Sequence, residues 1–168
     1  MKHFTYLIVS LLLLVAPLSI EAQSKVAHIN TQQLISEMPE VITAQNELKK
    51  LEEQYAKELE TSAKEFQTKA QTYQGDAQNQ TELINQQRQV ELQGMQQRIQ
   101  EFRETAAQEL QKRSAEMMRP LYEKARLSIE KVASAQGFDY VLDSSPGGSV
   151  IMASGTDLMT TVKTELGF

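Results

Sequence analysis

Side chains of mostly apolar character recur every eleven positions through the long middle section of this 168-residue chain. The second half of that section carries two such series and the first half three: Ile99, Leu110, Leu121 and Val132; Ile84, Met95, Ala106 and Met117; Leu48, Leu59 and Ala70; Ala44, Tyr55 and Phe66; and Leu51, Ser62 and Tyr73. Eleven residues over three turns give 3.67 residues per turn, so a seam with this spacing runs almost straight along an α-helix. The repeat therefore predicts two long helices that pack against each other along the seam.

The two helices are expected to form an antiparallel hairpin over residues 39–119. Pro39 followed by Glu40 is a helix-start signal, because proline suits the first helical position and a carboxylate favours the positive end of the helix dipole. Folding the chain at about residue 78 places Pro39 level with Pro120. The predicted hairpin is then about 54 Å long, at 1.5 Å per residue.

Three positions in this region interrupt helical geometry. Gly75 is expected near the end of the first helix, and Asn79 with Glu82 three residues later resembles a capping box for the second. Gly94 and Pro120 fall inside the second helix, where glycine loosens the backbone and proline removes a hydrogen-bond donor. We therefore predict bending points at Gly75, Gly94 and Pro120.

The N-terminus is typical of a secretory signal peptide. A short basic start precedes an apolar run over residues 4–20, and small residues follow it. We predict a signal peptide over residues 1–22, cleaved near Ala22 or Gln23, and an exported mature chain in the periplasm. A retained membrane anchor is the alternative, because the run approaches the length that spans a bilayer, but Pro17 near its end favours cleavage.

The remaining segments, residues 23–38 and 120–168, predict a small base with β-structure. Its expected parts are a strand over 25–30, helical turns over 31–37, the end of the long helix, a strand over 138–143, a turn over 145–148, a partner strand over 149–152 in a β-hairpin, and a last helix from about 156 to 167. The predicted fold class is therefore α+β, mostly α, with a long antiparallel helical hairpin projecting from a small β-sheet base.

A base of this size buries little apolar surface and leaves sheet edges unpaired, so it is marginal as a monomer. We therefore expect the base to oligomerise. The candidate residues are the apolar side chains of the predicted strands: Val26, Ile29, Phe138, Tyr140, Leu142, Val150 and Ile151.

The order of these parts resembles the Skp/OmpH family of periplasmic chaperones. The resemblance spans the mature chain, and its sharpest pieces are the Gly137-Phe138-Asp139-Tyr140-Val141-Leu142-Asp143 segment and the helix start at Asp157-Leu158. It implies a trimer in which a barrel-like base carries three helical hairpins around a cavity. It also implies an ATP-independent holdase that keeps unfolded outer-membrane proteins from aggregating in transit.

The outer part of the hairpin has a composition suited to such a role. A holdase needs adaptable, multivalent contact with unfolded chains, and this segment combines many glutamines with isolated apolar residues. The candidate client-binding residues are Tyr73, Leu83, Ile84, Val90, Leu92 and Met95. Of these, Val90 and Leu92 lie off the eleven-residue seam and are candidates for the inner wall of the cavity. Tyr73, Ile84 and Met95 can equally pack between the two helices.

Charge in the chain argues against an electrostatic mode of binding. The net charge is −5, with no basic stripe of the kind that neutralises nucleic-acid phosphates. Residues 68–98 balance three basic against three acidic side chains, so we expect capture through apolar and amide contacts with weak salt dependence. Whether the protein contacts a membrane surface is left open.

No catalytic or metal-binding pattern is recognisable. The chain has no cysteine, and His28 is the only histidine of the mature chain, which is too few to build the usual metal site. We expect no enzyme activity, no metal and no cofactor. The competing reading is an exported coiled-coil scaffold of the cell envelope, which would bind one folded partner through a defined stripe instead of many unfolded chains.

Overall fold

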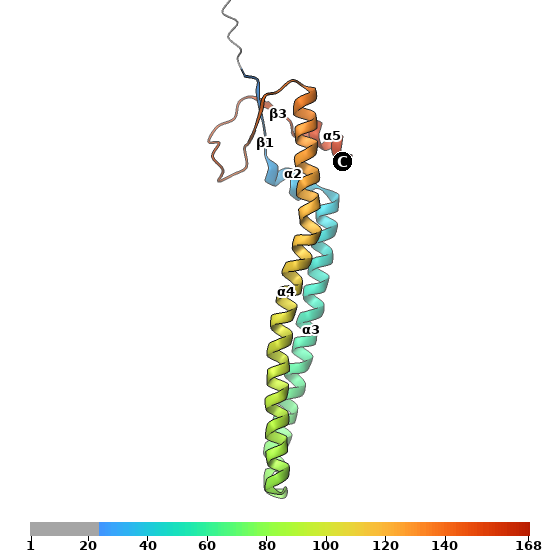
Figure 1. The fold of residues 1–168 in the computed structure, drawn as a ribbon, viewed down its shortest axis with the longest axis vertical. Coiled ribbons are helices and arrows are strands. Elements are labelled where there is room, and N and C mark those ends of the chain that lie inside the picture. The colour runs from blue at the N-terminus through green and yellow to red at the C-terminus, as the bar shows by residue number, and fades with distance from the viewer. Residues whose placement is uncertain (1–23) are drawn as a thin grey trace, which may run out of the picture.

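The computed structural model describes residues 24–168, so the predicted signal peptide lies outside the described residues. The elements in chain order are β1 (Val26–Ile29), α2 (Thr31–Glu37), α3 (Pro39–Asp76), the 3-10 turn η1 (Ala77–Asn79), α4 (Glu82–Ala135), β2 (Tyr140–Asp143), β3 (Thr156–Asp157) and α5 (Met159–Leu166). Helices α3 and α4 form a long hairpin that extends from a small base, as the sequence predicts (Figure 1).

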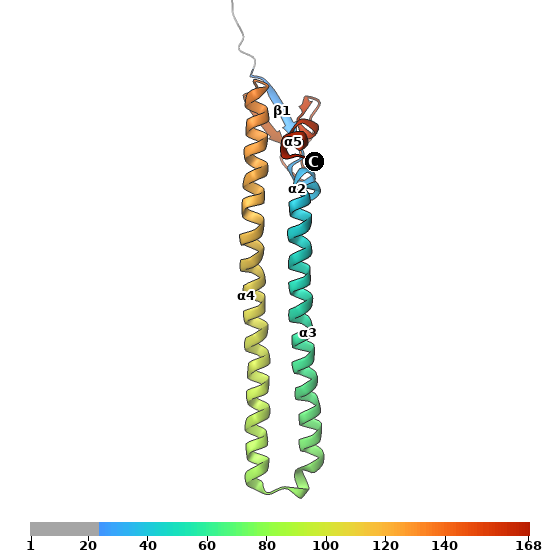
Figure 2. The ribbon, with the colours of Figure 1, turned by 90° about the vertical axis from the view of Figure 1, so that its right-hand side faces the viewer.

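The hairpin consists of two antiparallel helices that lie side by side along their length (Figure 2). Helix α3 has 38 residues, which corresponds to about 57 Å. Pro39 is at its first helical position, as expected, and Gly75 lies in its last turn. Thr81, instead of the predicted Asn79, caps α4: its hydroxyl accepts a hydrogen bond from the Ile84 backbone N–H at 3.3 Å. Asn79 belongs to the 3-10 turn.

Burial along α3 confirms the eleven-residue seam. Between residues 42 and 75, the only side chains that are not exposed are those at nine seam positions: Ala44, Leu48, Leu51, Tyr55, Leu59, Ser62, Phe66, Ala70 and Tyr73. On α4, Ile99, Leu110, Leu121 and Val132 are also shielded from solvent, and Val132, beyond Pro120, belongs to the core of the base. Tyr55 and Phe102 meet across the seam with perpendicular rings and centroids 5.8 Å apart.

The base contains a three-stranded sheet in the order β2-β1-β3, in which both pairings are parallel. The predicted strand over 149–152 is absent, and no β-hairpin follows β2. Instead, β3 pairs with β1 on the side opposite β2. Local β-propensity at residues 149–152 therefore does not decide the pairing, because strand order depends on the path of the whole chain.

The core of the molecule lies in the base. Its largest fully buried side chains are Ile29, Leu34, Met38, Val41, Leu158 and Val162. They come from β1, α2, the start of α3 and α5, and they pack with Ala125, Val132 and Ala133 of α4. The end of α4 is therefore built into the base, and the hairpin is anchored by its own two helices.

Polar contacts fasten the elements of the base to one another. The Asp143 carboxylate at the end of β2 accepts hydrogen bonds from the Thr31 hydroxyl at 2.7 Å and the Thr31 backbone N–H at 3.2 Å. Ser145 also donates to this carboxylate, from its hydroxyl at 2.6 Å and its backbone N–H at 3.0 Å. Burial acts to raise the pKa of Asp143, but the hydrogen bonds from Ser145 and Thr31 outweigh it and lower the pKa to about 2.

Candidate functional site

The outer half of the hairpin is thinly packed. In α3 no residue beyond Ala44 is buried, and in α4 no residue before Ala106 is buried. Tyr73 and Met95 are half-buried on the seam, and so is Leu92, which was predicted to lie off it. Leu92 therefore belongs to the face of α4 that points to α3.

The other apolar side chains predicted to bind clients point to solvent. Leu83 is 65% exposed, Val90 is 64% exposed and Ile84 is 37% exposed. The six candidates therefore do not form one patch: half of them lie on the inter-helix seam and half lie outside it.

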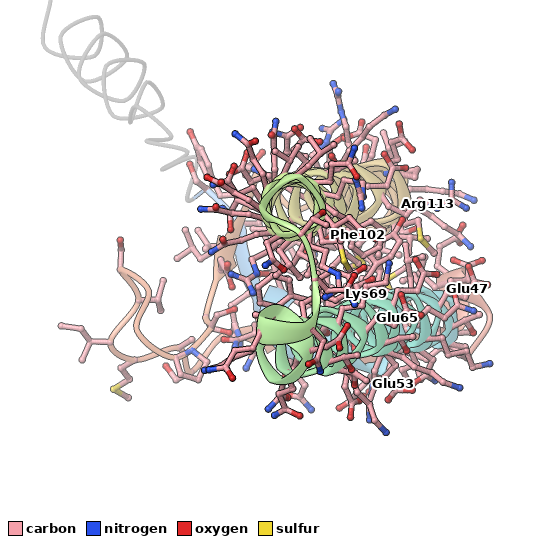
Figure 3. The ribbon with its side chains drawn as sticks, turned by 90° about the horizontal axis from the view of Figure 1, so that it is seen from below. Glu47, Glu53, Glu65, Lys69, Phe102 and Arg113 are labelled. Atoms are coloured by element: carbon pink, nitrogen blue, oxygen red, sulfur yellow. The ribbon has the colours of Figure 1, made fainter. Side chains whose placement is uncertain are left out.

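A polar cluster closes the tip of the hairpin, which we call the tip clasp (Lys69, Tyr73, Asp76, Arg88 and Glu91). The Tyr73 hydroxyl donates to Glu91 Oε2 at 2.5 Å, and Lys69 pairs with the other oxygen of Glu91. Arg88 Nη2 donates to Asp76 Oδ2 at 3.0 Å, and its guanidinium lies 4.6 Å from the centroid of the Tyr73 ring. Three residues of α3 are thereby joined to two of α4. Figure 3, viewed from the tip, shows Lys69 directed toward the space between the helices.

The tip clasp shifts the pKa values of its acidic groups. The hydrogen bond from Lys69, with that from Tyr73, lowers the pKa of Glu91, and the hydrogen bond from Arg88 lowers the pKa of Asp76. In turn, the hydrogen bond to Glu91 raises the pKa of the Tyr73 hydroxyl. Arg88 Nη1 is buried and has no hydrogen-bond partner among the described residues. Glu91 and Asp76 are therefore ionised at neutral pH, and the clasp leaves one buried nitrogen of Arg88 without a partner among the described residues.

Three grooves follow one side of α4. The first, of about 630 Å³, lies at mid-hairpin, the second, of about 810 Å³, lies nearer the base, and the third, of about 390 Å³, lies between the end of α4 and the sheet. Gln100, Gln111, Tyr122 and Ala133 each line one of the three and are eleven residues apart. This spacing places them on one face of α4, so the grooves are aligned. This second stripe is not among the features predicted from the sequence, although its spacing is the same eleven-residue repeat that predicts the seam.

A fourth groove, of about 460 Å³, lies on the opposite side of the hairpin at the same level as the first. Its lining includes Glu65, Arg98 and Phe102. Phe102 points between α3 and α4, and Arg113, eleven residues further, lies on the side away from the loop that follows β2 (Figure 3). Each of these two mid-hairpin grooves is lined by two acidic side chains and one basic side chain, so they differ in the side of the hairpin on which they lie and not in charge.

The base presents an apolar surface to solvent. Val26 and Tyr140 are paired in the sheet and share its outer face with Leu142, and all three are exposed. Ile29 points the other way: it is 1% exposed and belongs to the core, which corrects its assignment to an oligomer surface. Phe138 is half-buried against the core, with the Lys25 ammonium 4.3 Å from its ring centroid.

The loop over residues 144–155, which we call the arm, stands away from the rest of the base (Figures 1 and 3). Ile151 is 101% exposed and Met152 is 81% exposed, whereas Val150 is half-buried. Fully exposed large apolar side chains next to an exposed sheet face are typical of a protein–protein contact surface.

There is space for a side chain at two of the three predicted bending points. A Cβ added at Gly75 would meet nothing within 4 Å, and one added at Gly94 would meet only the end of the Arg98 side chain at 3.4 Å. Neither glycine is therefore required by close packing. Pro120 lies inside α4, which continues through it without interruption.

Residues 24–168 contain neither a cluster of metal-ligating side chains nor a helix that could span a bilayer. No group of three or more His, Cys, Asp or Glu side chains in residues 24–168 could hold a metal ion. His28 is half-buried, and its Nδ1 lies 3.2 Å from the Ser144 hydroxyl. No helix of the described part is both long and apolar enough to cross a bilayer.

Known proteins share this architecture. The family described as outer membrane protein (OmpH-like) matches residues 25–166. One of six matching solved chains is the crystal structure of a proposed outer membrane chaperone (OmpH-like) from Caulobacter crescentus CB15, with a TM-score of 0.77 at 17% sequence identity. The match covers 86% of this chain and 85% of that one. Among proteins with curated functions, none matches the sequence significantly. Because the family match extends over nearly all of the described residues, the chain belongs to the OmpH-like family.

Proposed function

We propose that this protein is a chaperone of the periplasm: an ATP-independent holdase that binds unfolded outer-membrane proteins and prevents their aggregation. Membership of the OmpH-like family and the fold shared with a proposed outer membrane chaperone support a chaperone role in general. The observation that best supports a holdase is the loose packing of the outer hairpin, whose seam is half-buried and whose other apolar side chains are exposed. Such a surface suits weak, multivalent contact with many sequences.

The working form in this proposal is a homotrimer assembled through the base. The exposed face of Val26, Tyr140 and Leu142, together with Ile151 of the arm, supplies apolar surface that a second copy would cover. Parallel hairpins of several copies would then enclose a space for the client. Sedimentation-equilibrium ultracentrifugation of the mature chain should give three times the protomer mass, and a monomer at micromolar concentration would contradict this part of the proposal.

Export is part of the same proposal. Cleavage near Ala22 or Gln23 would release the mature chain into the periplasm, where it would meet unfolded outer-membrane proteins. N-terminal sequencing of the protein recovered from a periplasmic extract should start close to Gln23. Recovery of the protein in the membrane fraction with Met1 retained would point to a tethered adaptor.

The direct test of holdase activity is light scattering. A urea-unfolded outer-membrane β-barrel protein is diluted rapidly into buffer with and without the mature chain, in the absence of nucleotide. We expect suppressed scattering at about one trimer per client, with little change between low and moderate salt because residues 68–98 carry no net charge.

Unchanged scattering at several-fold excess would favour the second candidate, an exported coiled-coil scaffold of the cell envelope. The regular eleven-residue seam favours that candidate, since a rigid rod can serve as a spacer. The two functions differ in the number of partners: the holdase would bind unrelated unfolded chains, and the scaffold one folded protein.

A further inference from the structure

We propose that the tip clasp is an acid-sensitive switch at the end of the hairpin. Protonation of its two carboxylates releases Arg88 from the space between the helices, so that α3 and α4 separate at the tip and apolar side chains of the seam become exposed there. The inference rests on the proposed function only in its last step, which is that this added surface strengthens the binding of an unfolded client.

An arginine occupies the seam at the tip, where the eleven-residue repeat predicts an apolar side chain. One series on α4 consists of Ile99, Leu110, Leu121 and Val132, and the position eleven residues before Ile99 is Arg88. The Arg88 side chain is only 20% exposed, so most of it is shielded from solvent. A charged group in such a place needs partners, because burial of an unpaired charge is costly. The outermost contact of the seam is therefore polar.

The partners of Arg88 satisfy it only in part. Its Nη2 donates to Asp76 Oδ2 at 3.0 Å, and its guanidinium lies 4.6 Å from the centroid of the Tyr73 ring. Its Nη1 is buried and has no hydrogen-bond partner among residues 24–168. Closure of the tip therefore leaves one donor without a hydrogen bond, and this cost is offset by the other contacts of the clasp.

Two carboxylates supply these other contacts. Glu91 of α4 accepts a hydrogen bond from the Tyr73 hydroxyl at 2.5 Å and pairs with Lys69, and Asp76 of α3 pairs with Arg88. The one further ion pair between α3 and α4 in the described part of the chain joins Glu40 to Lys124 near the base. Loss of both carboxylate charges would therefore leave the tip without an ion pair between its helices.

The other groups around the clasp do not replace the carboxylates. Asp76 also accepts hydrogen bonds from the uncharged amides of Asn79 at 3.2 Å and Gln80 at 2.7 Å. The further charged groups that act on the clasp are mostly basic: Lys69, Arg88, Arg98 and Glu65. Protonation of the two carboxylates thus leaves three positive charges at the tip, which repel one another and favour separation of the helices.

The direction of the pH dependence follows from the lowered pKa values of the clasp. The pKa of Glu91 is lowered chiefly by Lys69 and that of Asp76 chiefly by Arg88. The clasp is then complete above the ordinary values of 4.5 and 3.8 and is lost as pH falls through the lower folded-state values. Asp143 in the base has a pKa of about 2, so we expect the tip to open before the contacts of Asp143 are lost.

Release of Arg88 would uncover apolar side chains. Arg88 is one helical turn from Ile84 and from Leu92 on the same face of α4, and its guanidinium lies over the Tyr73 ring. Leu92 and Tyr73 are half-buried in the closed tip. Their exposure would add apolar surface at the end of the hairpin farthest from the base (Figure 2). Contact with an unfolded chain becomes more favourable as the apolar area that it can bury increases.

The test measures the distance between the helices at the tip. The chain has no cysteine, so Gln71→Cys on α3 and Gln89→Cys on α4, both at exposed positions, introduce its only two sites for spin labels. The full mature chain is labelled and mixed with an excess of unlabelled protein, which isolates the pair within one hairpin. We expect a narrow distance distribution at about pH 6 and a broader, longer one in acid, with a midpoint below about pH 4.5.

Two variants should move the switch in opposite directions. Glu91→Gln removes one of the two charges and should broaden the distribution already at about pH 6. Arg88→Leu continues the apolar seam and should keep the tip closed in acid. The matched control is Glu116→Gln, which removes a charge that pairs with Arg113 at 3.9 Å within α4 and should leave the distribution unchanged.

The distance measurements can overturn the switch in three ways. The unmodified protein could keep its narrow distribution throughout the titration. The Arg88→Leu variant could open in acid as much as the unmodified protein, which would assign the opening to general acid expansion. The Glu91→Gln variant could match the Glu116→Gln control at neutral pH, which would show that the clasp does not hold the tip closed.

Client binding tests the last step. Fluorescence anisotropy of a labelled, urea-unfolded outer-membrane β-barrel protein should show about three-fold tighter binding to Glu91→Gln than to the unmodified protein at about pH 6, and no gain for Arg88→Leu or Glu116→Gln. Equal binding to Glu91→Gln and the unmodified protein would overturn the effect of the switch on clients. Failure of the unmodified protein to bind any client would overturn the proposed function, whereas the distances would still decide whether the tip opens.

Discussion

The base and the outer hairpin are held together by different kinds of contact. The base buries large side chains completely, among them Leu34, Leu158 and Val162. The outer hairpin has a half-buried seam closed by a polar cluster at its end, and no large apolar residue there is buried. Burial of apolar area dominates folding free energy, so the base supplies most of the stability of the protomer. The hairpin extends far from the base and exposes more of its surface to solvent, and its helices are less tightly packed.

The strongest test of this difference is a matched pair of leucine substitutions. Leu158→Ala in the base should lower the free energy of unfolding by about 3 kcal/mol, because a fully buried leucine leaves a cavity. Leu59→Ala in the half-buried seam should cost about 1.5 kcal/mol or less. Urea denaturation followed by circular dichroism measures both. Equal costs would mean that the seam is as well packed as the core of the base.

The seam can be tested at its one aromatic pair. A double-mutant cycle with Tyr55→Ala and Phe102→Ala should give a coupling energy of about 1 kcal/mol, since perpendicular rings at 5.8 Å attract beyond their area burial. A coupling near zero would show that the helices are separated at this level in solution.

Within the base, Asp143→Asn tests the hydrogen bonds that the Asp143 carboxylate accepts from Thr31 and Ser145. We expect a loss of about 0.8 kcal/mol at neutral pH, after discounting the full pKa shift because the residue is exposed. The folded-state pKa of about 2 is below the ordinary value of 3.8, so the contribution is complete above 3.8 and lost as pH falls toward 2. The difference between the two proteins should therefore vanish in acid. A difference that persisted at pH 2 would assign the effect to something other than ionisation.

In the hairpin, Gly94→Ala should stabilise. Alanine is the better helix former, and the added Cβ meets only the mobile end of Arg98, so we expect a gain of about 0.5 kcal/mol. If Gly94 is a bending point, the distribution of spin-label distances between the hairpin tips of the proposed trimer should also become narrower. Gly75→Ala, with no atom within 4 Å, is the companion variant. Unchanged distance distributions for both would remove the glycines from the list of bending points.

The smallest global effect is expected at the tip clasp. Glu91→Gln removes the charge that Lys69 and Tyr73 share, and we expect faster amide hydrogen exchange at the tip with an unchanged unfolding midpoint of the base. The lowered pKa values of Glu91 and Asp76 predict the same opening in acid: the clasp is complete above pH 4.5 and loosens as pH falls below the ordinary values of 4.5 and 3.8. Slower exchange at the tip at pH 3 than at pH 6, corrected for intrinsic rates, would contradict this.

The candidate site was only partly predictable. The sequence predicts Leu83 and Val90 as apolar candidates of the outer hairpin, and both are exposed. It does not predict the half-burial of Leu92, because Leu92 belongs to neither of the two eleven-residue series on α4. The clasp between Tyr73 and Glu91 joins residues 18 apart across the turn. No local pattern marks such a pair, since it depends on how far each helix extends before the chain reverses.

The sequence alone determined the hairpin, because an eleven-residue repeat can bury its seam only in long straight helices, and Pro39 and the turn near residue 78 set their limits. It also predicted a strand over residues 138–143, of which residues 140–143 form β2. Only the tertiary structure decided the order and direction of the strands. Residues 149–152 have β-propensity but no strand partner among residues 24–168, whereas Thr156 and Asp157 reach β1 because α5 packs into the core beside it. Helical periodicity is a local property of the chain, and strand pairing is a contact between distant segments, so the first could be read from the sequence and the second could not.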